Sequence, residues 1–281
     1  MNLDKIFYLL TLFLLVTHTV ASVGEHVLEL KGNVTKAITI LCIGDSITEG
    51  GKTFSVYRYP LNKKLIDAGY NIKFIGPKSV TKGDVTLSHA GYGGKNTAYL
   101  DKLFNGIYAA HTADIILIHS AHNSFHHQKP VKGIVANLES IVKKARAVNP
   151  RVTILLGQGI TSGKLPKYSY IPQLNVEVGK LAKRLNTPDS IVVAVDHAKG
   201  FDWKIHTTKD KVHPNAQGAE KMASKWFEAL ENLPHFKKRS DRTAVKKIID
   251  NLLSQNPRQS SSLRGKTRFN VKESLLQTLT P

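Results

Sequence analysis

Short apolar runs alternate along the chain with longer segments in which apolar positions recur every three or four residues. Strands buried on both faces have the first pattern, and amphipathic helices have the second. The runs predict strands at 38–43, 71–76, 114–119, 152–156 and 191–195. The helical spacing predicts helices at 57–69, from Pro130 past Ala145, at 174–185, and after Asn215 as far as Leu230. Because strands and helices alternate, we expect one α/β domain, a three-layer α/β/α sandwich with a central parallel sheet.

The first 22 residues differ from this pattern. A lysine near the front is followed by an apolar run at 6–16 and then by small and polar residues up to Ser22. A run of this length is short for a membrane span and is typical of a secretory signal peptide cut near Ala21 or Ser22. We therefore expect a secreted or otherwise extracytoplasmic protein, with an uncleaved anchor as the alternative. Cys42 is the only cysteine, so no disulfide can form within the chain.

Residues 235–281 form a basic extension with few large apolar side chains. From Phe236 to Pro281 there are eleven Lys or Arg residues and three acidic ones. We expect this segment to be disordered or partly helical, and the alternative is contact with an anionic polymer or a membrane surface. The whole chain carries a net charge of +19, but no stretch interleaves aromatic with basic residues. We therefore expect no nucleic-acid partner.

The first apolar run leads directly into Gly44, Asp45 and Ser46. The carboxyl ends of the strands are where open α/β sheets bind ligands, so Ser46 is a candidate nucleophile on a rigid support. The alternative is that Asp45 or Ser46 only caps a following helix.

A serine nucleophile needs a neighbouring base and a group that orients that base. His213 is our candidate base, and Asp210, three residues earlier, can turn back to the other ring nitrogen. Two alternatives compete with this pair. They are Asp196 with the adjacent His197, and Asp202, which stands between Phe201 and Trp203. Adjacent residues such as Asp196 and His197 point apart along an extended chain, which favours Asp210 and His213.

Four segments together resemble the motifs of the SGNH hydrolases, also called GDSL esterases and lipases. They are 44–50 (GDSITEG), 89–95 (HAGYGGK), 118–123 (IHSAHN) and 210–215 (DKVHPN). The resemblance covers 36–234 and implies an SGNH or flavodoxin-like fold, a Ser-His-Asp triad of Ser46, His213 and Asp210, and no cofactor.

The resemblance also implies an oxyanion hole made by the backbone N–H groups of Ser46 and Gly94 and by the side-chain amide of Asn123. Gly93 is the alternative to Gly94. In a competing register His122 takes the place of Asn123, but only the Asn123 register keeps the preceding strand at its usual distance from the motif. We further expect Asp45, Arg58 and His122 to contact the substrate.

Several histidines cluster in one segment, at positions 119, 122, 126 and 127. Imidazoles bind zinc, but a catalytic zinc site needs three well-spaced ligands, and no His-Glu-x-x-His pattern is present. We expect no metal.

The residues at 55–61 and the His-x-Gly-Tyr form of the second motif are similar to those of acetylxylan esterases. We therefore expect a secreted serine esterase acting on a small-molecule or polysaccharide ester, most simply O-acetyl groups of a carbohydrate. The alternatives are a lipase or lysophospholipase, and an inactive carbohydrate-binding protein on the same fold.

Overall fold

The computed structural model describes residues 36–126, 129–234 and 236. The predicted signal peptide and all of the predicted basic extension except Phe236 lie outside these residues. Phe236 is buried and packs edge-on against Tyr70, with ring centroids 4.7 Å apart. Among the described residues, no helix has both the length and the apolar character needed to cross a membrane.

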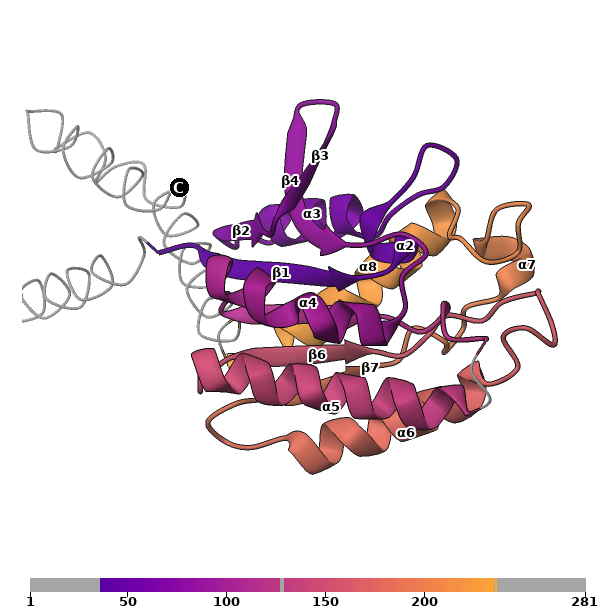
Figure 1. Ribbon diagram of the computed structural model, residues 1–281. Helices are drawn as coiled ribbons and strands as arrows, with labels where there is room; N and C mark the ends of the chain where they lie inside the picture. The colour runs from indigo at the N-terminus through magenta and orange to yellow at the C-terminus, as the bar shows by residue number, and fades with distance from the viewer. Residues whose placement is uncertain (1–35, 127–128, 235, 237–281) are drawn as a thin grey trace, which may run out of the picture. The chain divides into compact units, whose positions relative to one another are not determined.

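The strands of the structure form one seven-stranded, mostly parallel sheet (Figure 1). They are β1 (Ile38–Gly44), β2 (Ile72–Ile75), β3 (Lys78–Lys82), β4 (Val85–Gly91), β5 (Ile115–His119), β6 (Thr153–Gly157) and β7 (Val192–Val195). The order across the sheet is β3-β4-β1-β5-β6-β7, with β2 paired to β1 alone. On that side of β1, β2 pairs with Ile38–Leu41 and β4 pairs with Ile43 and Gly44. Of the described strands only β3 runs antiparallel, to β4, and the hydrophobic pattern had not predicted this hairpin.

The helices cover both faces of the sheet. They are α2 (Ser46–Glu49), α3 (Arg58–Asp67), α4 (Thr97–Ala110), α5 (Pro130–Val148), α6 (Ile171–Leu185), α7 (Trp203–His206) and α8 (Ala216–Glu231). One apolar core joins the sheet to α4, α5 and α6, and a second joins its other face to α3 and α8 (Figure 1). This confirms the predicted three-layer α/β/α sandwich.

The alternation of side chains in β1 explains why both cores are apolar. Leu41 and Ile43 pack into the core under α4, α5 and α6, whereas Ile40 and Cys42 pack into the core under α3 and α8. Successive residues of a strand point to opposite faces, so a central strand covered on both sides must be apolar at every position. The carboxyl end of this strand is therefore held rigidly from two sides.

Candidate active site

Ser46 begins a single helical turn directly after the central strand. Asp45 caps this turn, because its Oδ1 accepts a hydrogen bond of 2.9 Å from the Ile47 N–H. Glycine at position 44 lets the end of β1 lie close to β5, since a Cβ there would lie 2.2 Å from the His119 carbonyl oxygen. The half-buried Ser46 side chain thus stands at the carboxyl edge of the sheet.

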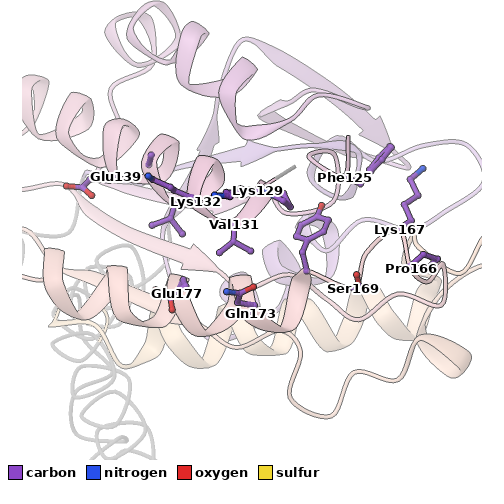
Figure 2. A pocket seen from close by; sticks show the side chains of 14 residues that line it. Phe125, Lys129, Val131, Lys132, Glu139, Pro166, Lys167, Ser169, Gln173 and Glu177 are labelled. Atoms are coloured by element: carbon purple, nitrogen blue, oxygen red, sulfur yellow. The ribbon is translucent and has the colours of Figure 1, made fainter. Parts of the chain in front are cut away.

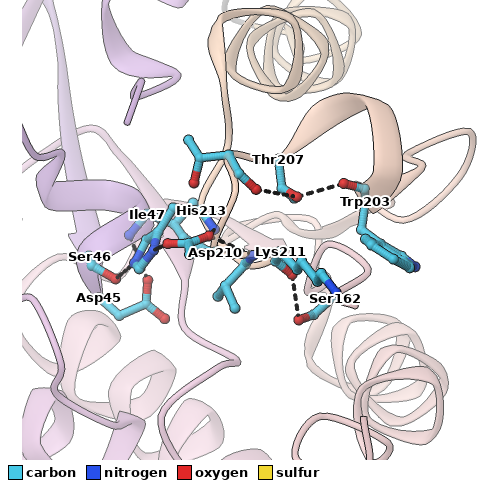
Figure 3. Close-up of polar contacts among 11 residues, drawn as sticks. Asp45, Ser46, Ile47, Ser162, Trp203, Thr207, Asp210, Lys211 and His213 are labelled. Atoms are coloured by element: carbon cyan, nitrogen blue, oxygen red, sulfur yellow. Dashed lines mark hydrogen bonds and ion pairs between the residues drawn. The ribbon is translucent and has the colours of Figure 1, made fainter. Parts of the chain in front are cut away.

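Ser46, His213 and Asp210 are joined by hydrogen bonds (Figure 3). The Ser46 Oγ lies 2.8 Å from the His213 Nε2, and the His213 Nδ1 lies 2.5 Å from the Asp210 Oδ2. An ionised carboxylate can only accept, so this contact places a proton on Nδ1 and leaves Nε2 free to accept the serine proton. Ser46 and His213, which are 167 positions apart, are thereby joined to Asp210 in the order that the predicted nucleophile, base and orienting acid require.

Asp210 is held in its ionised form. Burial raises the pKa of this carboxyl, but hydrogen bonds from the His213 ring, from the backbone N–H groups of His213 and Val212, and from Thr208 outweigh it and lower the pKa to about 2. The backbone bonds are 2.8 Å from Val212 and 2.9 Å from His213, both to Oδ1. Asp210 is therefore ionised at neutral pH.

The loop that carries Asp210 and His213 is fixed by contacts at Lys211. Lys211 has a φ of 63°, a left-handed conformation that is uncommon for a residue other than glycine. Its carbonyl oxygen accepts two hydrogen bonds of 2.9 Å, one from the Ser162 Oγ (Figure 3) and one from the Gly163 N–H. Local strain of this kind is kept only where the surrounding structure determines the backbone, and here that backbone carries Asp210 and His213.

The glycine loop after β4 faces Ser46. A Cβ on Gly93 would lie 3.8 Å from the Ser46 Cβ, so this backbone approaches the serine closely. The Gly93 N–H already donates to the Glu49 Oε2 at 2.6 Å. Gly94 has a φ of 72°, and the Asn123 Nδ2 donates to the carbonyl oxygen of the next residue, Lys95, at 3.0 Å. The three predicted oxyanion donors thus belong to segments that converge around Ser46.

Comparison with known proteins identifies the family of this chain. Residues 42–221, well over half of the sequence, match the GDSL-like Lipase/Acylhydrolase family. The chain belongs to this family. This match confirms the predicted family and supports the predicted activity of a serine-dependent ester hydrolase. No protein with a curated description matches the sequence significantly.

Solved structures of several esterases have the same fold. A carbohydrate esterase family 3 from Talaromyces cellulolyticus has a TM-score of 0.61 at 20% identity, with 69% of this chain and 96% of that chain covered. A Clostridium thermocellum family 3 carbohydrate esterase has a TM-score of 0.59 at 22% identity, covering 69% and 94%. An acetyl esterase mutant with acetate ion has a TM-score of 0.60 at 20% identity, covering 69% and 96%. At these identities the likeness concerns the fold.

The three residues predicted to contact the substrate do not lie in the open part of this hydrolase site. Asp45 and Arg58 are 0% exposed and His122 is 2% exposed. The Arg58 guanidinium donates to the carbonyl oxygens of Thr48, at 2.8 Å, and of Glu49, at 2.9 Å, so it caps the end of α2. His122 instead contacts the Ile160 carbonyl oxygen through its Nε2 at 3.1 Å. All three side chains therefore have partners within the protein, and their predicted contact with the substrate stays a prediction.

The competing acid and histidine residues have other partners. The Asp196 Oδ1 accepts from the backbone N–H groups of Ala198 and Lys199, and Asp202 caps α7. His197 is buried beside Trp226, with ring centroids 4.5 Å apart, and burial lowers its pKa to about 3. None of these residues is hydrogen-bonded to Ser46 within the described part of the chain.

Two buried histidines, His119 and His122, lie at and just after the carboxyl end of β5, the strand that pairs with β1. Burial lowers the pKa of His122 to about 4 and that of His119 further below its usual range, so both are neutral. Across residues 36–126, 129–234 and 236, no group of three or more His, Cys, Asp or Glu side chains is placed to hold a metal ion. His127 lies outside the described residues.

Sequence reasoning missed one residue that touches the triad. The Phe54 ring stacks on the His213 imidazole, with centroids 4.2 Å apart and planes inclined by 22°. The neighbouring Ser55 N–H donates to the Pro214 carbonyl oxygen at 2.9 Å, which ties this loop to the histidine loop. Phe54 lies in an irregular loop after two glycines, and no periodic pattern marks it as a partner of His213.

Proposed function

We propose that this protein removes O-acetyl groups from a carbohydrate through a covalent acyl-enzyme, with Ser46 as nucleophile, His213 as general base and Asp210 as the orienting acid. The observation that carries the proposal is the chain of hydrogen bonds from the Ser46 Oγ through the His213 ring to the Asp210 carboxylate. A serine hydroxyl is a weak nucleophile until a base accepts its proton, and this arrangement supplies that base.

The reaction follows from the geometry. The Ser46 Oγ attacks the ester carbonyl carbon as its proton passes to the His213 Nε2, and the resulting imidazolium is stabilised by Asp210. The imidazolium then protonates the departing sugar oxygen, which leaves Ser46 acetylated. A water molecule, deprotonated by the same nitrogen, attacks the acetyl carbon and releases acetate with regeneration of the serine.

The developing oxyanion needs donors that are already in place. We assign this role to the backbone N–H groups of Ser46 and Gly94 and to the Asn123 amide. The Gly93 N–H is engaged by Glu49, which favours Gly94 as the second donor. His122 is buried against Ile160, which favours Asn123 as the third.

The choice of an acetylated carbohydrate as substrate has its support in the comparisons. The structures with this fold include two carbohydrate esterases of family 3 and an acetyl esterase. The His89-to-Tyr92 motif and the segment at 55–61 give the same indication from the sequence. Export from the cell, which an extracellular polysaccharide substrate would require, is part of the proposal and has its support in the sequence of residues 1–22.

The test is hydrolysis of p-nitrophenyl acetate by the purified protein, followed by acetate release from a panel of O-acetylated glycans. We expect both activities, and we expect a serine-reactive phosphonate to abolish both. Failure to hydrolyse any ester would overturn the catalytic proposal in favour of a binding protein. Preference for p-nitrophenyl palmitate over the acetate would indicate the lipase alternative instead.

A further inference from the structure

A cleft of about 900 Å³ lies between the first turns of α5 and α6. Figure 2 shows its side chains, which come from both helices and from the segments that precede them. The residues used below are Phe125, Lys129, Lys132, Lys167 and Tyr170, with Glu139 and Glu177 farther along the helices. The volume is in the range of sites that bind extended small molecules or several sugar units.

One apolar cluster joins the lining of the cleft to the loop that carries His213. Phe125 and Tyr170 line it and also pack in a small apolar cluster with Tyr168 and Val212. Val212 directly precedes His213, and Phe125 follows Asn123 by two positions. A polymer with its ester group at Ser46 would extend along this cluster to reach the cleft.

The charges in the cleft are unbalanced. Glu139 is paired with Arg184 at 2.7 Å and with Lys143 at 2.8 Å, and Glu177 is paired with Lys180 at 2.8 Å. These three basic partners do not line the cleft. The charges of Glu139 and Glu177 are therefore neutralised by residues outside it.

The lysines that line the cleft, unlike its two glutamates, have no ion-pair partner among the described residues. Among the described residues no ion pair involves Lys129, Lys132 or Lys167. All three side chains are exposed, and the Lys167 Nζ lies 3.6 Å from the centre of the Phe125 ring. The cleft therefore presents three available ammonium groups beside an aromatic surface, which is complementary to a ligand that carries several carboxylates.

We propose that this cleft binds uronate units, and that the substrate of the enzyme is an O-acetylated acidic polysaccharide. This inference rests on the proposed function, because it names the polymer whose acetyl group reaches Ser46. The carboxylates of the chain contact Lys129, Lys132 and Lys167, and the sugar rings lie along Phe125 and Tyr170. The cleft acts on the affinity for the polymer and leaves the chemistry at Ser46 unchanged.

The experiment compares two triple variants of the full chain that remove the same charge. The first is Lys129→Gln/Lys132→Gln/Lys167→Gln. The control is Lys73→Gln/Lys102→Gln/Lys183→Gln, three exposed lysines that do not line the cleft. The substrates are O-acetylated polygalacturonate, O-acetylated glucomannan as a neutral polymer, and p-nitrophenyl acetate.

We expect the cleft variant to lose about tenfold in kcat/KM on acetylated polygalacturonate, through KM, since three exposed ion pairs are lost and each contributes only modestly to affinity. Its activity on the other two substrates should stay within about twofold of the wild type. The loss should shrink as salt is added, because salt screens exposed charges. The control variant should resemble the wild type throughout.

Binding is measured separately, with Ser46→Ala protein and deacetylated polygalacturonate oligomers, so that it does not depend on hydrolysis. Binding that requires the cleft lysines would support the inference whether or not the protein hydrolyses any ester. Failure to hydrolyse any ester would overturn only the proposed function. Two results would overturn the inference. One is equal loss in the cleft and control variants. The other is lysine-dependent binding to phosphatidylglycerol vesicles with none to polygalacturonate.

Discussion

The Glu49 carboxylate joins the turn that carries Ser46 to the glycine loop, because its Oε2 accepts the Gly93 N–H at 2.6 Å. The other oxygen, Oε1, accepts from the Lys78 Nζ at 2.6 Å. Burial raises the pKa of Glu49, but these two contacts outweigh it, and the pKa lies below its usual value. The carboxylate therefore remains ionised over the pH range of ester hydrolysis and positions the loop that contains Gly94.

The first prediction follows from this contact. Glu49→Ala should lower kcat on p-nitrophenyl acetate by about tenfold, the equivalent of one lost hydrogen bond, with little change in KM. Glu49→Gln keeps an acceptor for the Gly93 N–H and should recover most of the rate. The contribution of Glu49 to stability is present above its unfolded pKa and is lost as the pH falls through its lower folded value. Equal kcat values for the alanine and glutamine variants would show that the contact does not position the loop.

The second prediction concerns the triad. Ser46→Ala and His213→Ala should each lower kcat by about 10⁵-fold or more, and the double variant should be scarcely worse, because the residues act as one unit. Asp210→Asn should cost roughly 10³–10⁴-fold. Steady-state kinetics with thermal unfolding as a check on folding would measure this, and Asp196→Asn is the control. A His213→Ala protein with near wild-type activity would refute the assignment.

The third prediction separates the two registers of the oxyanion motif. Asn123→Ala should lower kcat by about 10²–10³-fold with a smaller change in KM, the usual effect of losing one oxyanion donor. His122→Ala removes a buried ring and should lower the free energy of unfolding more than it lowers kcat. Steady-state kinetics and urea unfolding of both variants would distinguish the two registers. A large loss of kcat in His122→Ala with little loss in Asn123→Ala would reassign the third donor to His122.

The fourth prediction concerns Asp45 and pH. Burial raises the pKa of this fully buried carboxyl from 3.8 to about 6, even though the Ile47 N–H donates to it. A raised folded pKa favours folding at low pH, and this contribution is lost as the pH rises from about 4 through 6. Two pKa units correspond to about 3 kcal/mol.

The variant Asp45→Asn keeps a capping oxygen and cannot ionise. Between pH 4 and pH 7 its free energy of unfolding should therefore rise relative to that of the wild type by about 3 kcal/mol. Urea unfolding at several pH values would measure the difference. Asp202→Asn, at the exposed cap of α7, is the control, and a difference independent of pH would exclude ionisation of Asp45 as the cause.

Much of the fold could be predicted from the sequence because buried strands and amphipathic helices have different periods. The strand predicted at 114–119 is β5 (Ile115–His119), and the helix predicted from Pro130 is α5. The β3–β4 hairpin was missed, because β3 and the start of β4 are largely exposed and neither strand has a strong alternation of apolar and polar residues.

The site could be predicted only in part. Ser46, Asp210 and His213 lie in compact motifs, and the structure brings them together. The orientation of Arg58 depends on α2 and β4, whose carbonyl groups it contacts, and the stacking of Phe54 depends on where two distant loops meet. Such relationships arise from tertiary packing, and local sequence does not encode them.

The single thiol of Cys42 can be used to measure how often the central sheet opens. Its side chain is fully buried in the middle of β1, and burial raises the pKa of the thiol to about 12. A maleimide reacts with the thiolate, so labelling can proceed only when the central strand separates from its neighbours. The rate of labelling would therefore measure how often the sheet opens beneath Ser46, and a ligand that binds the closed protein would slow it.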